Sequence, residues 1–141
     1  MGDGIQNQTR SRRAVKHLVV LCLLLTSCAR PQTGRVTRIL DGDTLELDGE
    51  RVRLALVDAP ELDTAAGWQA RTYLEAACPV GSNARIVRGG TDGYGRTVGK
   101  VTCGGLNLNE LMIVSGNARL WRSYCRGSFG RTDWGRRAGC D

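Results

Sequence analysis

Apolar and polar residues alternate in three short runs between residues 36 and 57, and a tight turn separates each run from the next. The runs are Val36–Leu40, Thr44–Leu47 and Arg51–Val57, and the turns are Asp41-Gly42-Asp43 and Asp48-Gly49-Glu50. Alternation with a period of two is typical of strands that bury one face, and Asp-Gly pairs favour tight turns. The pattern therefore predicts a meander of three strands that begins a small barrel.

The third predicted strand has one apolar face and one face that includes an arginine. The two faces carry Val52, Leu54 and Leu56 on one side and Arg53, Ala55 and Val57 on the other. Because successive side chains of a strand point to opposite faces, Arg53 is expected outside the core. Pro60 is expected to end the strand, since it cannot donate to a ladder.

The next segment changes to helical spacing and is followed by a second pair of strands. Apolar positions recur at helical intervals across Trp68–Ala77, which predicts a helix. Its inward stripe is Ala70, Tyr73, Leu74 and Ala77. Beyond it, Ala84–Arg88 and Arg96–Thr102 predict a hairpin around the glycine-rich loop 89–95.

A second helix is predicted to begin at Asn107, because Asn107 and Glu110 have the spacing of a capping box. It is expected to continue to Ser115, since Gly116 is a typical C-terminal stop. Its inward stripe, which is ordinary core packing, is Leu108, Leu111, Met112 and Ser115. The element order predicts an α+β fold that is mainly β, namely a five-stranded OB-fold barrel with two to three helices.

The start of the chain has a different character from this domain. Residues 10–17 (RSRRAVKH) are basic and residues 18–25 (LVVLCLLL) are uninterrupted apolar. Such a run is too short to cross a bilayer as a helix, which needs roughly 20 residues. A charged start followed by a short apolar run is typical of a secretory signal, here residues 1–27. The alternative is a buried N-terminal strand or helix.

Leu25-Thr26-Ser27-Cys28 resembles the lipobox of bacterial lipoproteins. The resemblance implies cleavage before Cys28, a lipid on that cysteine, a tether over residues 28–34 and a folded domain over 35–141. Ala29 after the cysteine favours the outer over the inner membrane. The alternative is cleavage near Ala29, which would give a freely secreted protein.

Four cysteines remain once Cys22 and Cys28 are assigned to the export segment, an even number that favours disulfides in an exported domain. None has the CxxC spacing of a zinc site. Cys78 precedes the first hairpin strand and Cys103 ends the second, so a Cys78–Cys103 bridge is predicted. Cys125–Cys140 would then staple a short, arginine-rich C-terminal tail.

The formal charge of +6 is distributed unevenly along the chain. The only histidine, His17, lies in the export segment, which excludes imidazole chemistry from the domain. Eight carboxylates lie between residues 41 and 63, while Lys+Arg outnumber acids by 11 to 5 from residue 64 onward. Clustered carboxylates suit a hard divalent cation, and arginine forks suit phosphate. Together they indicate a metal-assisted phosphodiester site.

Three segments together resemble the staphylococcal nuclease (thermonuclease) family. They are Ile39-Leu40-Asp41-Gly42-Asp43-Thr44, Arg53-Leu54-Ala55-Leu56-Val57-Asp58-Ala59-Pro60-Glu61 and Thr91-Asp92-Gly93-Tyr94-Gly95-Arg96. Leu108-Asn109-Glu110 and Gly116-Asn117-Ala118 also fit the family pattern, so the similarity spans roughly residues 35–121. The resemblance implies a thermonuclease-type barrel and calcium-dependent cleavage of DNA and RNA with little sequence specificity.

The resemblance also implies a role for each matched residue. Asp43, Asp58 and the backbone carbonyl of Ala59 would bind Ca²⁺, with Asp41 as a secondary carboxylate nearby. Glu61 would be the general base, which fits a domain without histidine. Arg53 and Arg96 would grip the scissile phosphate.

The resemblance implies that Tyr94 lines the nucleotide pocket. The region past residue 121 departs from the family, because it lacks the long charged helix expected there. Trp121 and Tyr124 are candidates for stacking on a base.

We expect a monomer that acts on DNA and RNA and is attached to a membrane through Cys28. One alternative is an envelope lipoprotein whose OB-fold binds nucleic acid without cleaving it. A second is a disulfide-stapled lipoprotein that binds another kind of ligand, with the barrel as scaffold.

Overall fold

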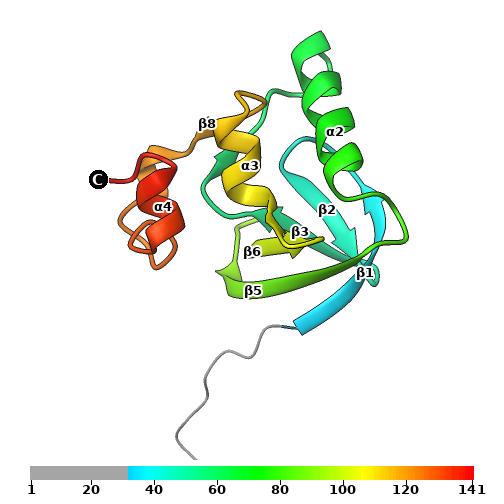
Figure 1. Ribbon diagram of the computed structural model, residues 1–141, viewed down its shortest axis with the longest axis horizontal. Helices are drawn as coiled ribbons and strands as arrows, with labels where there is room; N and C mark the ends of the chain where they lie inside the picture. Colours follow the sequence, from blue (N-terminus) through cyan, green and yellow to red (C-terminus); the bar gives the residue numbers. More distant parts are fainter. Residues whose placement is uncertain (1–31) are drawn as a thin grey trace, which may run out of the picture. The chain divides into compact units, whose positions relative to one another are not determined.

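The computed structural model describes residues 32–141, and the chain there forms eight strands, three α-helices and one 3₁₀ helix (Figure 1). In chain order these are β1 Gln32–Ile39, β2 Thr44–Leu47, β3 Glu50–Leu54, β4 Val57–Asp58, α2 Ala65–Ala77, β5 Asn83–Thr91, β6 Thr97–Cys103, β7 Leu106–Asn107, α3 Leu108–Val114, β8 Arg119–Leu120, η2 Arg122–Tyr124 and α4 Asp133–Arg137. The predicted signal peptide 1–27, Cys28 and the start of the tether lie outside the described residues. None of the described helices is long and apolar enough to span a membrane.

Five strands close into the predicted barrel. They follow the order β3-β2-β1-β5-β6, and β3 pairs with β6 in parallel to complete the ring. All the other pairings within the ring are antiparallel. β7 extends the sheet beyond β6, and β4 and β8 form a separate two-stranded ribbon. The expected α+β OB-fold is therefore confirmed.

The meander and the hairpin form where the sequence places them, but several boundaries differ. β1 begins at Gln32, so residues 32–34, predicted as tether, are strand, because their backbone pairs with Ile86 to Ala84 of β5. The hairpin strands extend to Thr91 and Cys103, so its loop is shorter than the predicted 89–95.

The predicted third strand, Arg51–Val57, is wrong in its second half. β3 ends at Leu54, and the chain turns at Ala55 and Leu56, where Leu56 has a φ of +66°. Arg53 lies outside both apolar clusters, on the face opposite Val52 and Leu54, yet it is only 8 % exposed. The Arg53 side chain is covered by the Trp121 ring, by Asp43 and by the Val57 carbonyl, which come from other parts of the chain.

Helix α2 begins at Ala65, three residues earlier than predicted, because Thr64 caps it. The Thr64 hydroxyl accepts a hydrogen bond from the Gly67 N–H at 3.0 Å. Of the predicted stripe, Ala70 and Leu74 are fully buried, whereas Tyr73 is exposed.

Helix α3 begins as predicted, but without the capping box. The Asn107 side chain makes no cap bond, and its amide donates to Glu110 instead, at 3.4 Å. The helix ends at Val114, and Gly116 follows in the left-handed conformation at a φ of +75°. Leu108 and Met112 are buried as predicted, while Ser115 is exposed.

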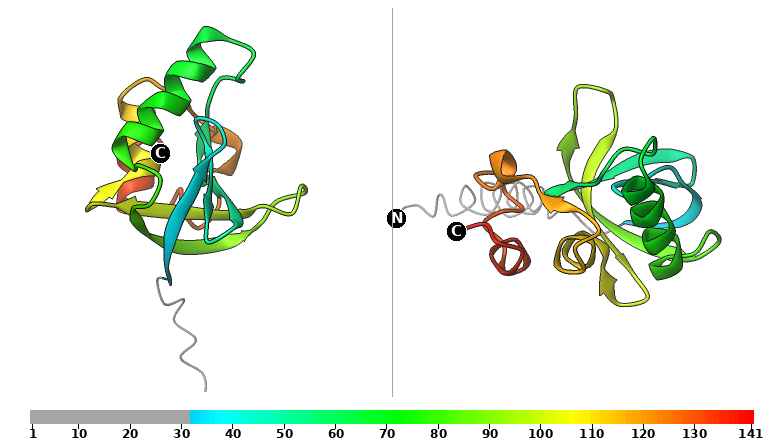
Figure 2. Two further views of the ribbon diagram at one scale, coloured as in Figure 1. Left: turned by 90° about the vertical axis from the view of Figure 1, so that its right-hand side faces the viewer. Right: turned by 90° about the horizontal axis from the view of Figure 1, so that it is seen from above.

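Two apolar clusters stabilise the chain. The larger one fills the barrel and packs against α2 and α3. The smaller one joins Leu56 to Trp134 and Cys140, with Phe129 packed against it. It anchors the segment that we call the tail, residues 121–141, which lies beside α3 on the side away from α2 (Figure 2).

Both predicted disulfides are confirmed. Cys78–Cys103 joins the end of α2 to the end of β6, and Cys125–Cys140 closes a loop within the tail. Cys125 and Cys140 are 15 positions apart, and by the loop-entropy model a disulfide that closes a loop of this size adds about 3 kcal/mol of stability. The tail is therefore held by a covalent bridge as well as by its small apolar cluster.

Asn109 is fully buried in α3 and binds three backbone groups, which belong to two parts of the chain. Its amide nitrogen donates to Ala55 O at 2.9 Å and to Gly99 O at 3.0 Å. Its amide oxygen accepts from the Val101 N–H at 2.9 Å. A single side chain thus holds the turn after β3 against β6.

Replacing Asn109 with alanine should lower the free energy of unfolding by about 3 kcal/mol, because three buried hydrogen bonds to the backbone are lost. Chemical denaturation measures this change. Asn83→Ala, at an exposed position on β5, is the matched control and should change stability by less than about 0.5 kcal/mol. Equal effects of the two variants would contradict this role for Asn109.

Candidate active site

Asp43 and Arg53 form a buried ion pair next to the turn between β1 and β2. Arg53 Nη2 lies 3.3 Å from Asp43 Oδ2, and each residue is 8 % exposed. Arg53 also donates from Nη1 to the Val57 carbonyl at 3.1 Å, and Asp43 Oδ1 accepts from the Thr44 hydroxyl at 2.8 Å. Arg53 is therefore held on two sides, by a carboxylate and by the backbone of β4.

The turn at Asp41–Asp43 is pressed against the loop that follows β4. A Cβ on Gly42 would lie 2.7 Å from the Ala59 Cβ and 2.6 Å from the Ala70 Cβ, so only glycine fits without displacement. The Ala59 N–H donates to Asp43 Oδ2 at 3.2 Å. The two loops that carry the predicted calcium ligands are thus neighbours.

Asp41 adds a second carboxylate to this turn. Its Oδ1 accepts a hydrogen bond from the Asp43 N–H at 2.9 Å. Burial and then the charge of Asp43 raise the pKa of the Asp41 carboxyl above its ordinary value. The turn therefore places two carboxylates close together, and carboxylate oxygens are ligands that suit a hard cation.

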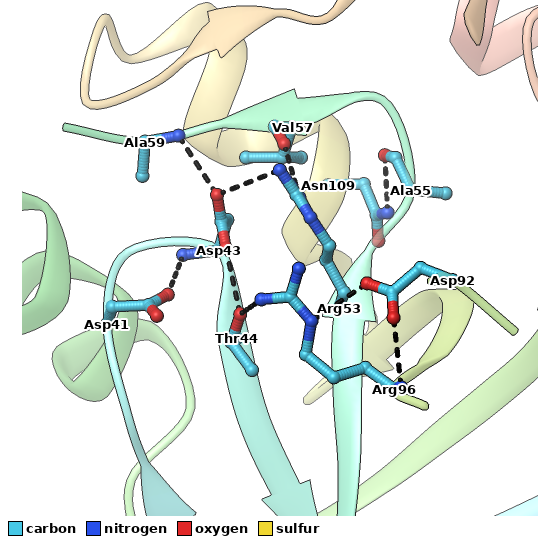
Figure 3. A network of polar contacts seen from close by, with 10 residues as sticks. All are labelled: Asp41, Asp43, Thr44, Arg53, Ala55, Val57, Ala59, Asp92, Arg96 and Asn109. Atoms are coloured by element: carbon cyan, nitrogen blue, oxygen red, sulfur yellow. Dashed lines mark hydrogen bonds and ion pairs between the residues drawn. The ribbon is translucent and has the colours of Figure 1, made fainter. Parts of the chain in front are cut away.

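Arg96 reaches the same corner from the loop between β5 and β6 (Figure 3). It donates from Nε to Asp92 Oδ2 at 2.8 Å and from Nη1 to the Thr44 hydroxyl at 3.3 Å. Burial alone would raise the pKa of Asp92, but bonds from Arg96 and from the Tyr94 N–H lower it overall. The Arg53 and Arg96 guanidinium groups therefore meet at the Asp43–Thr44 corner.

Three aromatic rings surround these two arginines. The Arg53 guanidinium lies 4.3 Å from the centre of the Trp121 ring, and that of Arg96 lies 5.4 Å from the Tyr94 ring. Tyr124 meets Trp121 edge to face at a centroid distance of 4.9 Å. The structure thus brings together the predicted arginines and the predicted aromatic residues.

A pocket of about 460 Å³ is lined by both arginines and all three rings. Its other walls are the β5–β6 loop and tail residues that include Gly127, Ser128 and Phe129. A Cβ on Gly89 would lie 2.2 Å from the Phe129 ring, so the tail packs closely on β5. The tail therefore forms one wall of this pocket.

The predicted carboxylates lie apart from the pocket. Asp58 and Glu61 are exposed, and none of Asp41, Asp43, Asp58 and Glu61 lines the pocket. Within residues 32–141, no three acidic, histidine or cysteine side chains cluster as a metal site would require. The arginine pair thus lies between the acidic loops and the pocket.

The backbone at Glu61 is nevertheless well fixed. Its carbonyl oxygen accepts hydrogen bonds from the Thr64 hydroxyl at 2.7 Å and from the Thr64 N–H at 3.1 Å. A Cβ on Gly67 would lie 1.9 Å from the same carbonyl oxygen, so the first turn of α2 packs directly on it. Glu61 therefore has a rigid main chain and a side chain open to water.

Sequence reasoning gave no role to four residues that build this site, namely Gly42, Thr44, Asp92 and Asn109. For Asp92 a signal was present, since an aspartate followed by glycine favours a turn in which its side chain binds the backbone two residues on. Asp92 Oδ1 does accept from the Tyr94 N–H, at 2.9 Å. For the other three, the partners are distant in sequence, so no local pattern points to them.

Residues 51–133 match the family model described as "Staphylococcal nuclease homologue". A micrococcal nuclease of Shigella flexneri is 38% identical over 79% of this chain and 71% of its own length. The succinoglycan biosynthesis protein ExoI of Rhizobium meliloti is 37% identical over 71% of this chain and 59% of its own. An uncharacterized endonuclease of Haemophilus influenzae is 34% identical over 76% of this chain and 63% of its own length. The chain thus spans about 60 to 70% of the length of these curated relatives.

An ion pair between α3 and α4 attaches the tail wall to the barrel. Arg137 Nε lies 2.7 Å from Glu110 Oε1, and this hydrogen bond is the main cause that lowers the pKa of Glu110 below its ordinary value of 4.5. A lowered folded-state pKa stabilises the fold above the unfolded-state pKa and loses that effect as the pH falls through the folded value.

Glu110→Gln should therefore remove part of the acid-induced loss of stability between about pH 5 and pH 2. The variant should be less stable than wild type near neutrality and equally stable at the acid end. Thermal unfolding across this pH range measures the effect. Glu75→Gln, which removes a carboxylate that forms no ion pair among the described residues, is the control. Parallel wild-type and Glu110→Gln curves would refute the assignment.

Proposed function

This chain belongs to the staphylococcal nuclease family, and we propose that it is a phosphodiesterase that hydrolyses DNA and RNA with little sequence specificity. The convergence of Arg53 and Arg96 beside a pocket lined by aromatic side chains is the observation that carries this proposal. Two guanidinium groups can bind the oxygens of one phosphate, and aromatic faces can stack on the adjoining base. Relatives named as nucleases support the same conclusion.

Arg53 and Arg96 are held by different residues, but both are proposed to bind the same phosphate. Each has five N–H groups and uses two of its nitrogens on the contacts described above, so N–H groups remain for phosphate. Because the guanidinium groups are oriented before substrate arrives, they stabilise charge that develops on the phosphate oxygens without reorganising. Such preorganised donors typically contribute several kcal/mol to catalysis.

Glu61 is proposed as the general base that takes a proton from the attacking water. Its carboxylate is exposed, so water reaches it freely, and its fixed main chain limits where it can go. A carboxylate is the group available for this step, since the described residues contain no histidine. Tyr94, Trp121 and Tyr124 are proposed to hold the nucleotide.

Ca²⁺ is proposed as the cofactor, held by Asp43, Asp58 and the Ala59 carbonyl, with Asp41 close by. The donor chemistry fits, because all these groups are hard oxygen ligands and the Ala59 N–H bond to Asp43 holds the two loops together. A bound Ca²⁺ would offset negative charge on the phosphate.

Glu61→Gln should lower kcat by about 100-fold or more, since a positioned general base contributes about 10² to 10⁴. Affinity for a DNA oligonucleotide should stay unchanged. The measurements are cleavage of DNA and RNA in calcium and in chelator, together with binding by fluorescence anisotropy. Asp63→Asn, at an exposed position in the same loop, is the control.

Two results would count against this assignment. If wild-type protein with calcium leaves both nucleic acids intact yet binds them, the non-catalytic alternative holds. If Glu61→Gln cleaves as fast as Asp63→Asn does, another group is the base.

We further propose that the protein is exported and anchored in the bacterial envelope by a lipid on Cys28, at the outer membrane. The basic and apolar segments before Cys28 and the lipobox-like sequence support this proposal. The two disulfides of the domain agree with it, because disulfides persist in oxidising compartments.

Cys28→Ala should move the protein from the membrane fraction to the soluble fraction, because the lipid is its proposed anchor. Cys22→Ala, in the apolar run 18–25 that precedes Cys28, is the matched control and should leave the protein in the membrane fraction. Fractionation followed by immunoblotting measures both. A Cys28→Ala protein that stays with membranes would exclude lipid anchoring at this residue.

A further inference from the structure

The positive charge of the domain is concentrated in the tail. Residues 121–141 contain five arginines and two aspartates, a formal charge of +3. Residues 32–120 contain 10 basic and 11 acidic residues, a formal charge of −1. All five tail arginines are exposed. The excess cationic surface of this domain therefore belongs to the tail and not to the barrel.

A second hollow, of about 350 Å³, lies within the tail and gathers three of these arginines. Its lining is Cys125, Arg126, Gly130, Arg131, Arg136, Cys140 and Asp141. Arg136 pairs with Asp133 at 2.6 Å and donates to the Arg131 carbonyl at 2.8 Å. Arg126 and Arg131 form no ion pair with any described residue. Two guanidinium groups are thus left available beside one that is held in place.

The tail hollow is rigidly built. The Cys125–Cys140 bridge forms part of its lining. A Cβ on Gly130 would lie 1.9 Å from the Cys125 carbonyl oxygen, so the backbone is tightly folded at this point. Asp141 also lines this hollow, so three arginines stand against one carboxylate there. The fixed backbone sets where the arginine side chains begin, which reduces the conformational entropy lost when they bind an anion.

The hollow is also adjacent to the candidate active site along the chain. Residues 124–131 divide between the two, with Tyr124 and Gly127–Phe129 on the active-site pocket and Cys125, Arg126, Gly130 and Arg131 on the tail hollow. One short loop is therefore the wall between them. A strand bound at Arg53 and Arg96 could continue across this wall.

We propose that Arg126, Arg131 and Arg136 form a second phosphate-binding subsite, which holds the backbone of a nucleic-acid strand beyond its scissile phosphate. This inference rests on the proposed function, because that function supplies the strand. Arginine forks match phosphate oxygens bidentately, and backbone contacts of this kind carry no sequence preference. The subsite would make binding depend on strand length, since a dinucleotide is too short to reach it.

The test compares Arg126→Gln/Arg131→Gln with the control pair Arg38→Gln/Arg85→Gln, which removes the same charge from exposed positions on β1 and β5. Both pairs are placed in a Glu61→Gln background with calcium present. Fluorescence anisotropy measures binding of an oligo-dT of roughly 12 nucleotides, a length typical of one OB-fold site, and of the dinucleotide dTdT. Each measurement is repeated over a range of salt concentrations.

The tail pair should weaken binding of the longer probe about tenfold. It should also make the negative salt slope, d log K/d log[salt], smaller in magnitude by about 1.4, the value for two lost contacts to a single strand. Binding of dTdT should change less than about twofold, and the control pair should alter both probes equally. Arg126→Lys/Arg131→Lys keeps the charge, so it should restore the salt slope. This variant also controls for damage to the fold.

The proposal is overturned if the tail pair affects the longer probe no more than the control pair does, or if it weakens dTdT equally. Its outcome is separate from that of the nuclease assignment. If the wild-type protein cleaves nothing but its binding depends on the tail, the subsite proposal stands and the nuclease proposal fails. If the protein cleaves nucleic acid but its binding does not depend on the tail, the nuclease proposal stands and the subsite proposal fails.

Discussion

The parallel pairing of β3 with β6 is the contact on which the candidate active site depends. It closes the barrel, and its register sets Val52 opposite Thr97 and Arg53 opposite Val98. Arg96, the residue before Thr97, is therefore brought beside Arg53, although 43 positions separate them in the sequence. Asn109 supports this closure from α3, because its amide holds the Gly99 and Ala55 carbonyls and the Val101 N–H together. The two arginines can grip one phosphate because the ring is closed in this register.

At the barrel closure, each arginine is paired with one aspartate and keeps N–H groups that can bind a phosphate. A buried ion pair adds little net stability, but breaking one typically costs about 3 to 5 kcal/mol, so it fixes orientation strongly. Arg53 is fixed in this way by Asp43, and Arg96 by the more accessible Asp92. Because Asp43 also receives the Ala59 N–H, the acidic loops are tied to the same corner. The site thus links its anionic and cationic halves through a single aspartate.

The tail shows how a small domain extends its site without a larger core. A domain of this size buries a modest core, and the tail adds an apolar cluster around Trp134 and a disulfide in place of further barrel contacts. Phe129 lies against β5 where Gly89 leaves room for it. The Glu110–Arg137 pair attaches α4 to α3. These contacts set the wall of the pocket and the arginines of the tail hollow in one rigid unit.

By itself, the sequence determined the barrel and both disulfides, and it singled out the two arginines and three aromatic residues that line the pocket. Those features depend on local signals, namely the alternation along β1–β3, the glycine turns, the hairpin that joins Cys78 to Cys103, and motifs that keep their order. The break of the third strand at Leu54, the burial of Arg53 and the roles of Thr44 and Asn109 were decided by tertiary structure. The physical reason is that burial and hydrogen bonding of these residues depend on partners far along the chain, such as Gly99 for Asn109 and Arg96 for Thr44. A strand's own pattern does not reveal that distant segments, here β4 and Trp121 of the tail, cover its second face.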